Sequence, residues 1–295
     1  MMRWMKYKWL YFIISALVII PGIISLFVYG LRPGIDFTGG TLLELQFEKN
    51  FQFPISNFQL KEIVEEKGLA VSSVQISGNN SVLIRMKPIT KEEAAMIKTT
   101  LGERFNKTPE EIRFETVGPI LGKELLIKTI VAIILAAGFI LGYVAWRFKN
   151  AKFGVCAILA MFHDTLVMLG LFSILGHFFG AEVDTLFVTA MLTVLSFSVH
   201  DTVVVYDRIR ESQKLLPTTP FESLINKAVT ETLSRSLNNS LTIIFMLLAL
   251  LLLGGVTIKW FVAALLIGTV SGTYSSTFNA APLLVVWENL KSRKH

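Results

Sequence analysis

The chain alternates between long apolar runs and shorter polar stretches, and six of the runs are long enough to predict membrane-spanning helices. They lie near residues 9–29, 125–146, 153–176, 183–206, 237–257 and 259–287. A hydrocarbon core about 30 Å thick requires roughly 20 apolar residues in a helix. The last run is longer than this, so it either tilts or continues past the membrane as a surface helix.

The segment 30–124, between the first two runs, has the pattern of a folded α+β domain. Strands are predicted at 41–47, on both sides of a turn at 78–80 within 71–87, and at 111–117, and helices at 56–68 and 90–105. Both helices begin with a capping-box spacing, Ser56 with Gln59 and Thr90 with Glu93. The order β-α-β-β-α-β predicts a ferredoxin-like head domain.

Lysine and arginine are concentrated in alternate connections, which predicts the orientation of the spans. These residues are Arg3, Lys6, Lys8, Arg147, Lys149, Lys152, Arg208, Arg210, Lys214, Lys227, Arg235, Lys291, Arg293 and Lys294. The positive-inside rule places both termini in the cytoplasm and the segment 30–124 outside. The segment 207–236 is then a cytoplasmic loop, in which an amphipathic helix after Pro220 is predicted to lie along the membrane surface.

The composition supports a polytopic membrane protein. Of 295 residues, 53% are hydrophobic and 17% charged, and the mean hydropathy is +0.58. The net charge of +6 fits basic cytoplasmic loops better than a nucleic-acid surface, because clustered basic and aromatic residues are missing. Cys156 is the single cysteine, so neither an internal disulfide nor a cysteine-based metal site is expected. The sequence has no G-x-x-x-x-G-K-[ST] motif, so a membrane gradient is the expected energy source rather than a bound nucleotide.

Asp201 is the first candidate functional residue, because it lies inside the fourth apolar run. It precedes Asp207 by six residues, which is about 9 Å along a helix. An aspartate near the centre of a membrane helix costs about 2.5–3.5 kcal/mol, so its side chain should face protein or water. A carboxylate that alternates between charged and neutral states suits a proton relay. The alternative is a structural carboxylate paired with a neighbouring helix.

Arg235 is the predicted cation for Asp201. Asn239 and Thr242 follow Arg235 at i+4 and i+7, which places the three on one helix face. The alternative for Arg235 is simple anchoring, with its side chain extended to the membrane surface. Arg208 is a competing partner, since it follows Asp201 by seven residues on nearly the same face.

His163 and Asp164 form a second candidate site near the middle of the third run. A buried histidine beside an aspartate can relay protons. It can also be a satisfied polar pair that holds helices together. In the fourth run His200 points about 100° away from Asp201 around the helix, so it need not share its site. Thr202, the residue after Asp201, is a supporting candidate.

Two patterns of small residues are also candidates. The sixth run carries Gly268, Gly272, Ser276 and Ala280 at every fourth position. This spacing predicts close packing against another helix. The stretch GIDFTGGT contributes Gly34, Asp36, Gly39 and Gly40. It predicts a tight turn before the first strand, to which Asp36 hydrogen bonds.

Six stretches together resemble the SecD/SecF protein-export family, on its SecF side. They are GIDFTGGTLLEL, VGPILGKEL, HDTLVMLGLFS, HDTVVVYDRIRE, TLSRSLNNSLT and LLIGTVSGTYSSTFNAAPLLVVWE. The likeness covers nearly the whole chain in the family's order, spacing and topology. In that family the residues that match Asp201 and Arg235 are implicated in proton passage. The family usually has asparagine before that aspartate, where this chain has His200.

The resemblance implies a subunit of the bacterial inner membrane that pairs with SecD in a twelve-span unit resembling the resistance–nodulation–division transporters. Such a unit joins the SecYEG channel and uses the proton-motive force to complete preprotein export after the ATPase SecA has acted. Its partners are therefore SecD, SecYEG, unfolded preprotein and membrane lipid, with no nucleic acid. Protons are the coupling ion, and no cofactor, metal or enzymatic reaction is implied.

Two other functions remain open. A proton-coupled exporter of small molecules or lipids predicts twelve spans and a larger outer domain than the predicted head. A purely structural partner, without a proton relay of its own, predicts that Asp201→Asn is tolerated.

Overall fold

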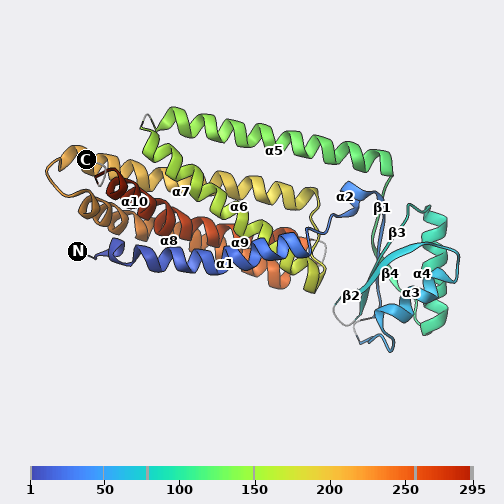
Figure 1. The fold of residues 1–295 in the computed structure, drawn as a ribbon. Coiled ribbons are helices and arrows are strands. Elements are labelled where there is room, and N and C mark those ends of the chain that lie inside the picture. The colour runs from blue at the N-terminus through green and yellow to red at the C-terminus, as the bar shows by residue number, and fades with distance from the viewer. Residues whose placement is uncertain (1, 49, 78–79, 149, 256–257, 293–295) are drawn as a thin grey trace. The chain divides into compact units, whose positions relative to one another are not determined.

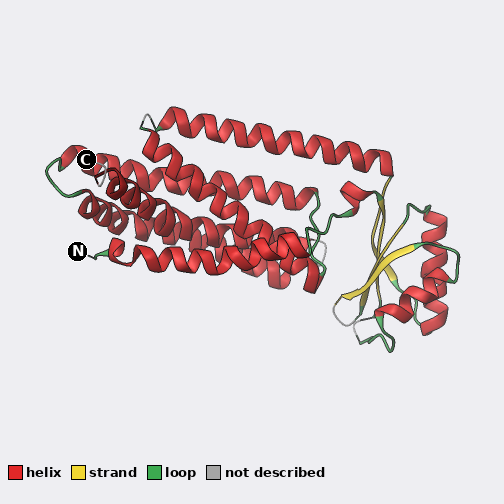
Figure 2. Cartoon of the chain, viewed as in Figure 1, coloured by secondary structure: helices red, strands yellow, loops and turns green. Residues whose placement is uncertain are grey.

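The structure, a computed structural model, describes residues 2–48, 50–77, 80–148, 150–255 and 258–292. The chain divides into two compact units, Pro33–Ile130 and Met1–Arg32 with Val131–His295 (Figure 1). The first contains the sheet and the second is built of helices (Figure 2). Several predicted features lie outside the described residues: Gly78 and Asn79 of the turn, and Lys149, Arg293 and Lys294 of the basic connections.

Six helices in the described part of the chain are long and apolar enough to cross a membrane, which confirms the six predicted spans. They are α1 (Lys8–Val28, preceded by a 3-10 turn at Trp4–Tyr7), α5 (Pro119–Arg147), α6 (Ala151–Phe179), α7 (Thr185–Leu215), α8 (Phe221–Leu253), and a last span made of α9 (Lys259–Ser275), a π-helical turn (Ser276–Ala280) and α10 (Ala281–Ser292). The chain is a multi-pass membrane protein.

The helix α8 differs from the prediction. A surface helix and a separate fifth span were expected to meet at residue 236, where the hydropathy changes. Instead one helix runs from Phe221 to Leu253. Neither glycine nor proline occurs between these residues, so nothing in the sequence interrupts the backbone hydrogen bonds. The expectation of a separate surface helix is therefore wrong.

The sixth span contains a π-helical turn, which the sequence analysis did not anticipate. Pro282 follows the turn, lacks a backbone N–H and is sterically incompatible with the carbonyl four residues earlier. That carbonyl belongs to Phe278, inside the turn, so local widening is the expected response. Ser276 and Ala280, two residues of the predicted small-residue pattern, belong to this turn and are fully buried. The hydroxyl of Tyr206 on α7 donates to the carbonyl of Ala280 at 2.8 Å, which fixes the turn to α7.

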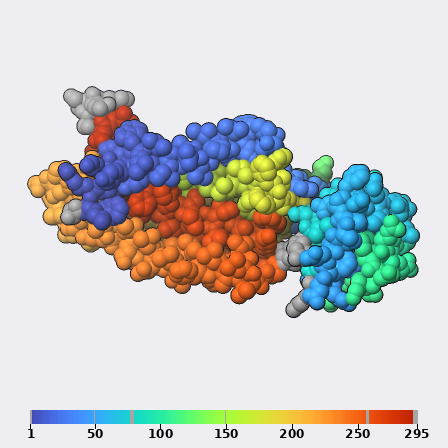
Figure 3. All heavy atoms as spheres, turned by 90° about the horizontal axis from the view of Figure 1, so that it is seen from below, coloured from blue at the N-terminus to red at the C-terminus, as the bar shows by residue number. Residues whose placement is uncertain are grey.

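Helices α1 and α6 approach closely at two glycines. A Cβ atom added to Gly170 would lie 2.6 Å from the Cα of Gly22. The hydroxyls of Ser25 and Ser173 lie 2.8 Å apart, and Ser173 also donates to the carbonyl of Gly30 at 2.7 Å. Figure 3 shows α1, in blue, lying against the yellow-green α6 in the helical unit. This contact requires that no side chain stands between the two backbones.

Helices α9 and α7 are packed in the same way. A Cβ atom at Gly268 would overlap the side chain of Val194, and one at Gly272 would lie 3.2 Å from the Cβ of Ser198. The first two small residues of the predicted pattern therefore face α7. This close approach brings the hydroxyls of α9 within reach of the centre of the bundle.

The unit Pro33–Ile130 is a sheet covered on one face by helices (Figure 1). Its elements are α2 (Ile35–Thr38), β1 (Gly40–Gln46), α3 (Asn57–Glu65), β2 (Val71–Ser77), β3 (Ser81–Met86), α4 (Lys91–Phe105) and β4 (Glu110–Val117). The sheet order is β2-β3-β1-β4 with antiparallel neighbours. Strands and long helices follow the predicted order, and both capping boxes are present. The ferredoxin-like assignment stays a prediction.

The head's core lies between this sheet and the two helices. Its fully buried members include Leu43, Leu45, Leu60, Val82, Ile84 and Leu101. Leu43 and Leu45 are two residues apart on β1, so they share the face that the helices cover.

The predicted turn before β1 is a one-turn helix, α2. Gly34 is its N-cap residue and Asp36 lies in its first turn. The hydroxyl of Thr38 donates to the carbonyl of Gly34 at 3.1 Å. A hydrogen-bonded turn therefore precedes β1, as the glycine-rich stretch predicted, whereas the hydrogen bond expected from Asp36 stays a prediction.

The two glycines after this turn are required by the backbone. Gly39 has φ +72° and Gly40 has φ +130°, values that residues with a Cβ atom rarely adopt. An added Cβ would lie 2.8 Å from the Cα of Pro119 at Gly39, and 2.8 Å from the carbonyl oxygen of Met86 at Gly40. The pair thus allows β1 to pass close to β3 and to the start of α5.

Candidate functional site

Asp201 lies in the middle of α7, at its contact with α8. Its side chain is 6% exposed and accepts one hydrogen bond among the described residues, from the hydroxyl of Ser236 to Oδ2 at 3.1 Å. An ionised carboxylate offers about four acceptor positions, so one neutral donor leaves most of them unused. Thr202 beside it is also buried. A buried acid with so little compensation is typical of a functional group in a membrane protein.

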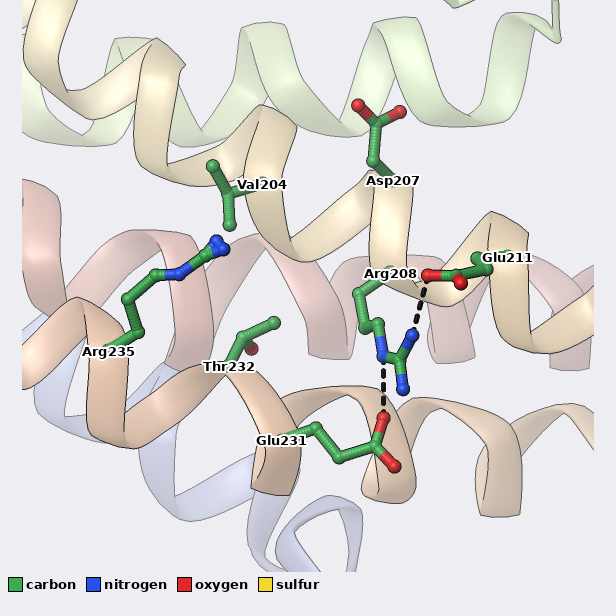
Figure 4. A pocket seen from close by; sticks show the side chains of 7 residues that line it. All are labelled: Val204, Asp207, Arg208, Glu211, Glu231, Thr232 and Arg235. Atoms are coloured by element: carbon green, nitrogen blue, oxygen red, sulfur yellow. Dashed lines mark hydrogen bonds and ion pairs between the residues drawn. The ribbon is translucent and has the colours of Figure 1, made fainter.

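Arg235 precedes Ser236 on α8 but lines a separate pocket of about 510 Å³. Figure 4 shows its guanidinium group extended toward Val204. Among the described residues no ion pair or hydrogen bond joins Arg235 to Asp201. Consecutive residues on a helix point about 100° apart, so when Ser236 faces Asp201 its neighbour does not. The predicted pairing is therefore absent from this conformation.

Arg208, the competing partner, is held by two carboxylates. Its Nε lies 2.6 Å from Glu231 on α8, and its Nη1 lies 2.5 Å from Glu211 on α7 (Figure 4). Arg208 and these two carboxylates line the same pocket as Arg235. Within the part of the chain that the structure describes, Arg235 is thus the pocket cation that lacks an ion-pair partner.

Asn239 follows Arg235 by four residues on α8, but it lines a different cavity. It lies with His200 in a groove between α7 and α8 of about 720 Å³. The other lining residues are Leu192, Thr193, Ser196, Phe197 and Ile243. Thr242 turns its hydroxyl to the carbonyl of Asn238 at 2.9 Å. The predicted polar stripe is therefore divided between a pocket and a groove.

Asp164 lies halfway along α6 and is fully buried. Its Oδ1 accepts from the hydroxyl of Ser271 at 2.6 Å and lies 3.0 Å from Nδ1 of His163. Its Oδ2 accepts from Ser198 at 2.5 Å and from Ser275 at 2.6 Å. One carboxyl group therefore joins α6 to α7 and α9. We call Asp164 and its four partners the Asp164 cage.

His163 belongs to the Asp164 cage and also lines a groove on the surface of the bundle. The groove has a volume of about 400 Å³ and is formed by α1, α6 and α9. Nε2 of His163 is buried and has no hydrogen-bond partner among the described residues. The ring is thus bonded on one side and unsatisfied on the other.

The sequence analysis identified His163 and Asp164 but missed the three serines that bind Asp164. Ser271 and Ser275 are four residues apart, so they share one face of α9. That spacing, one residue away from the small-residue pattern, was the available signal. Ser198 offers no comparable signal, because only the crossing of α7 with α6 brings it to Asp164.

The described residues contain no cluster of three or more His, Cys, Asp or Glu side chains that could hold a metal ion. The polar groups described above are carboxylates, hydroxyls, two imidazoles, guanidinium groups and a carboxamide. Proton transfer and ion pairing are the chemistry that this set of groups supports.

Comparisons with known proteins identify the family. The family described as "Protein export membrane protein SecD/SecF, C-terminal" matches residues 97–290, and the "SecD/SecF GG Motif" matches residues 24–50. The chain is 47% identical to the protein translocase subunit SecF of Thermobaculum terrenum, over 96% of this chain and 93% of that protein. It is 42% identical to SecF of Anaerolinea thermophila, over 96% and 92%.

The chain belongs to the SecD/SecF protein-export family. Among solved structures it is similar to SecDF from Thermus thermophilus, with a TM-score of 0.84, 34% identity and coverage of 97% of this chain and 38% of that one. The residues that match the GG motif include Gly39 and Gly40, both of which have positive φ angles. Both halves of this SecD/SecF chain, head and helices, are therefore covered by family likeness.

Proposed function

We propose that this chain, a SecF-like subunit of the Sec protein translocase, uses the proton-motive force to promote late steps of preprotein export. Its relatives are protein translocase subunits, and one of them, from Thermus thermophilus, is a SecDF chain. The observation that carries the proton step is Asp201, a buried carboxylate with a single neutral donor among the described residues. That donor, Ser236 on α8, directly follows Arg235, which has no ion-pair partner in the described part of the chain.

In the proposed mechanism, Asp201 takes a proton from the outer side of the membrane. When Asp201 is ionised, Arg235 pairs with it as the counter-charge. When Asp201 is protonated, the Arg235 side chain returns to the pocket that it lines in this structure. The two states favour different α7–α8 arrangements, and this difference moves the head. One charge crossing 100 mV corresponds to about 2.3 kcal/mol, enough to change such an equilibrium substantially.

The proposed partners follow from the relatives' names. A SecDF relative suggests that a SecD-type subunit completes the membrane unit. We further propose contact with SecYEG, with the emerging preprotein and with lipid, in a bacterial inner membrane with both termini in the cytoplasm. The chain is proposed to act as a transport subunit without cofactors, and not as an enzyme.

Export of a pulse-labelled secretory protein tests the proton step, in cells whose only copy carries Asp201→Asn. We expect export to fall to the level of the deletion, because the amide keeps the shape but cannot carry the proton. Co-purification of the SecD-type partner shows whether the complex still assembles. Normal export with an assembled complex would instead favour the structural-partner alternative.

Asp207→Asn is the matched control for this experiment. Asp207 lies on the same helix, six residues further on, and is ion-paired with Arg147 and Arg210 at a partly exposed position. Exposed ion pairs contribute only about 0.2–1 kcal/mol. We therefore expect this variant to retain most of the export activity.

A further inference from the structure

The Asp164 cage satisfies an ionised carboxylate. The hydroxyls of Ser198, Ser271 and Ser275 donate to it, and Nδ1 of His163 is a fourth donor in the tautomer that carries the ring proton there, at distances of 2.5–3.0 Å. With two donors on each oxygen, all four usual acceptor positions are occupied. A buried charge without a neighbouring lysine or arginine requires this degree of hydrogen bonding.

The same cage also satisfies a neutral Asp164, provided that His163 changes tautomer. When a proton binds Nε2 of His163, the proton on Nδ1 can pass to Oδ1 of Asp164. The products are a neutral histidine protonated on Nε2 and a neutral carboxylic acid that donates to Nδ1. The three serine contacts are unchanged, so one proton is taken up without the loss of a hydrogen bond.

A purely structural role for the Asp164 cage does not explain the position of Nε2 of His163. Buried polar atoms in folded proteins nearly always have a partner. Nε2 of His163 is buried without one in the described part of the chain, and His163 lines the groove between α1, α6 and α9. Ser15, Ser271 and Tyr274 line the same groove, and their hydroxyls donate to Asn279, Asp164 and the carbonyl of Tyr11. Of these polar lining groups in the described part of the chain, Nε2 of His163 is therefore the one left without a partner.

Few other titratable groups face this site. Tyr274 of α9 lies with its ring centroid 6.2 Å from that of His163, and its hydroxyl donates to the backbone of Tyr11 on α1. On α7, Asp201 follows the cage residue Ser198 by three residues and is bonded to α8 instead. Among the described residues no lysine or arginine is bonded to the cage, so the proton chemistry belongs to the pair itself.

We propose that His163 and Asp164 form a second proton-accepting site, which takes up a proton at Nε2 of His163 from the α1–α6–α9 groove and holds it on Asp164. The proposal deepens the proton coupling proposed above and rests on it for its role in export. It adds a site near that of Asp201, because Ser198, which donates to Asp164, precedes Asp201 by three residues on α7. The presence of the site can be tested without any export assay.

Acid-induced infrared difference spectra of the full chain in lipid bilayers test the proposal. The background variant is Asp201→Asn, so that Asp201 makes no contribution. We expect a carbonyl-stretch band of a neutral carboxylic acid that is lost when Asp164→Asn is added. If the two spectra are the same, Asp164 does not take up a proton and the proposal is wrong, whatever the export result for Asp201.

A second pair of variants identifies the band even if Asp164→Asn fails to fold. Ser275→Ala removes a donor to Oδ2, which is the carbonyl oxygen of the proposed neutral acid, and the band should shift to higher frequency because the carbonyl group loses a hydrogen bond. Ser276→Ala is the matched control, because Ser276 is equally buried on the same span but donates to the carbonyl of Thr273. A band unaffected by Ser275→Ala, or shifted equally by Ser276→Ala, contradicts its assignment to the cage.

The role of His163 is tested by His163→Phe in the same background. Phenylalanine is similar in size but offers neither a route for the proton nor an acceptor for the hydroxyl group of neutral Asp164. We expect the Asp164 band to be lost while the serine contacts keep the helices packed. A band of unchanged intensity would show that Asp164 is protonated without His163, and would overturn the relay.

Discussion

Three buried carboxylates are stabilised in three different ways. Asp164 accepts four hydrogen bonds, whereas Asp201 accepts one in the part of the chain described. Glu44, on β1 of the head, is 3% exposed and lies opposite Arg113 of β4 in the sheet register. Because burial penalises the charged form, the number and charge of the partners decide how each acid responds to protons.

Glu44 gives a prediction for the head. Burial raises the pKa of Glu44 above its usual value, and the positive charge of Arg113 opposes this only in part. The folded head therefore binds this proton more tightly than the unfolded chain does. Its stability falls as the pH rises from the usual glutamate range through the raised pKa. We expect Glu44→Gln to remove this pH dependence and to increase the free energy of unfolding at neutral pH.

Hydrogen exchange of the β1 amides in the full chain measures this effect, after correction for the intrinsic pH dependence of exchange. Glu110→Gln, at an exposed position of β4, is the control and should leave the pH dependence unchanged. A lower free energy of unfolding for Glu44→Gln at neutral pH would mean that attraction to Arg113 outweighs the cost of burial.

The acids of the membrane unit were predictable from the sequence, but their partners were not. Asp164 and Asp201 stand out because charged residues are rare in apolar runs. Ser198 does not stand out, because serine is tolerated in any membrane helix. Which serine reaches Asp164 depends on helix crossings that no local pattern encodes. For the same reason the predicted pairing of Arg235 with Asp201, based on one helix alone, is absent from this conformation.

At the scale of elements, the apolar runs predicted the existence of the helices correctly but not the residues at which they begin and end. Helix α8 begins at Phe221, sixteen residues before the apolar run at 237–257. Hydropathy predicts only which part of a helix lies in the membrane, so it does not show where the helix itself begins. The π-helical turn at Ser276–Ala280 has a local cause in Pro282, but its fixation by Tyr206 is a tertiary contact. The capping boxes of α3 and α4 are purely local and were therefore predicted correctly.

The contact between α1 and α6 gives a prediction at this scale. Gly170→Ala adds a methyl group 2.6 Å from the Cα of Gly22, where only backbone could move away. Overpacking of this kind costs about 1–3 kcal/mol. We expect a clear decrease in the thermal unfolding temperature of the purified chain in lipid or detergent.

Gly154→Ala is the matched control, because Gly154 lies on the same helix and an added Cβ would meet nothing within 4 Å. Alanine favours a helix over glycine by about 0.5–1 kcal/mol, so this variant should be as stable as the parent or more so. If both variants behave alike, the close approach of α1 to α6 does not determine stability.

At the scale of the whole molecule, the basic helix ends should lie on one side of the membrane. The basic residues at or near these ends include Lys6, Lys8, Arg147, Lys152, Lys214 and Lys291. Because six spans alternate in direction, these ends all fall on the same side, and the head and the connection after α8 fall on the other. The positive-inside rule predicts that the basic side faces the cytoplasm.

Single cysteines test this orientation. The native Cys156 is 1% exposed, so the parent chain should react little with a membrane-impermeant maleimide. We expect Lys67→Cys in the head and Gly255→Cys after α8 to be labelled in intact cells, since both positions are exposed. Thr218→Cys, exposed between α7 and α8, should be labelled only after the membrane is opened. Labelling of Thr218→Cys in intact cells would invert the topology, and Asp201 would then have to take its proton from the side opposite to the one proposed.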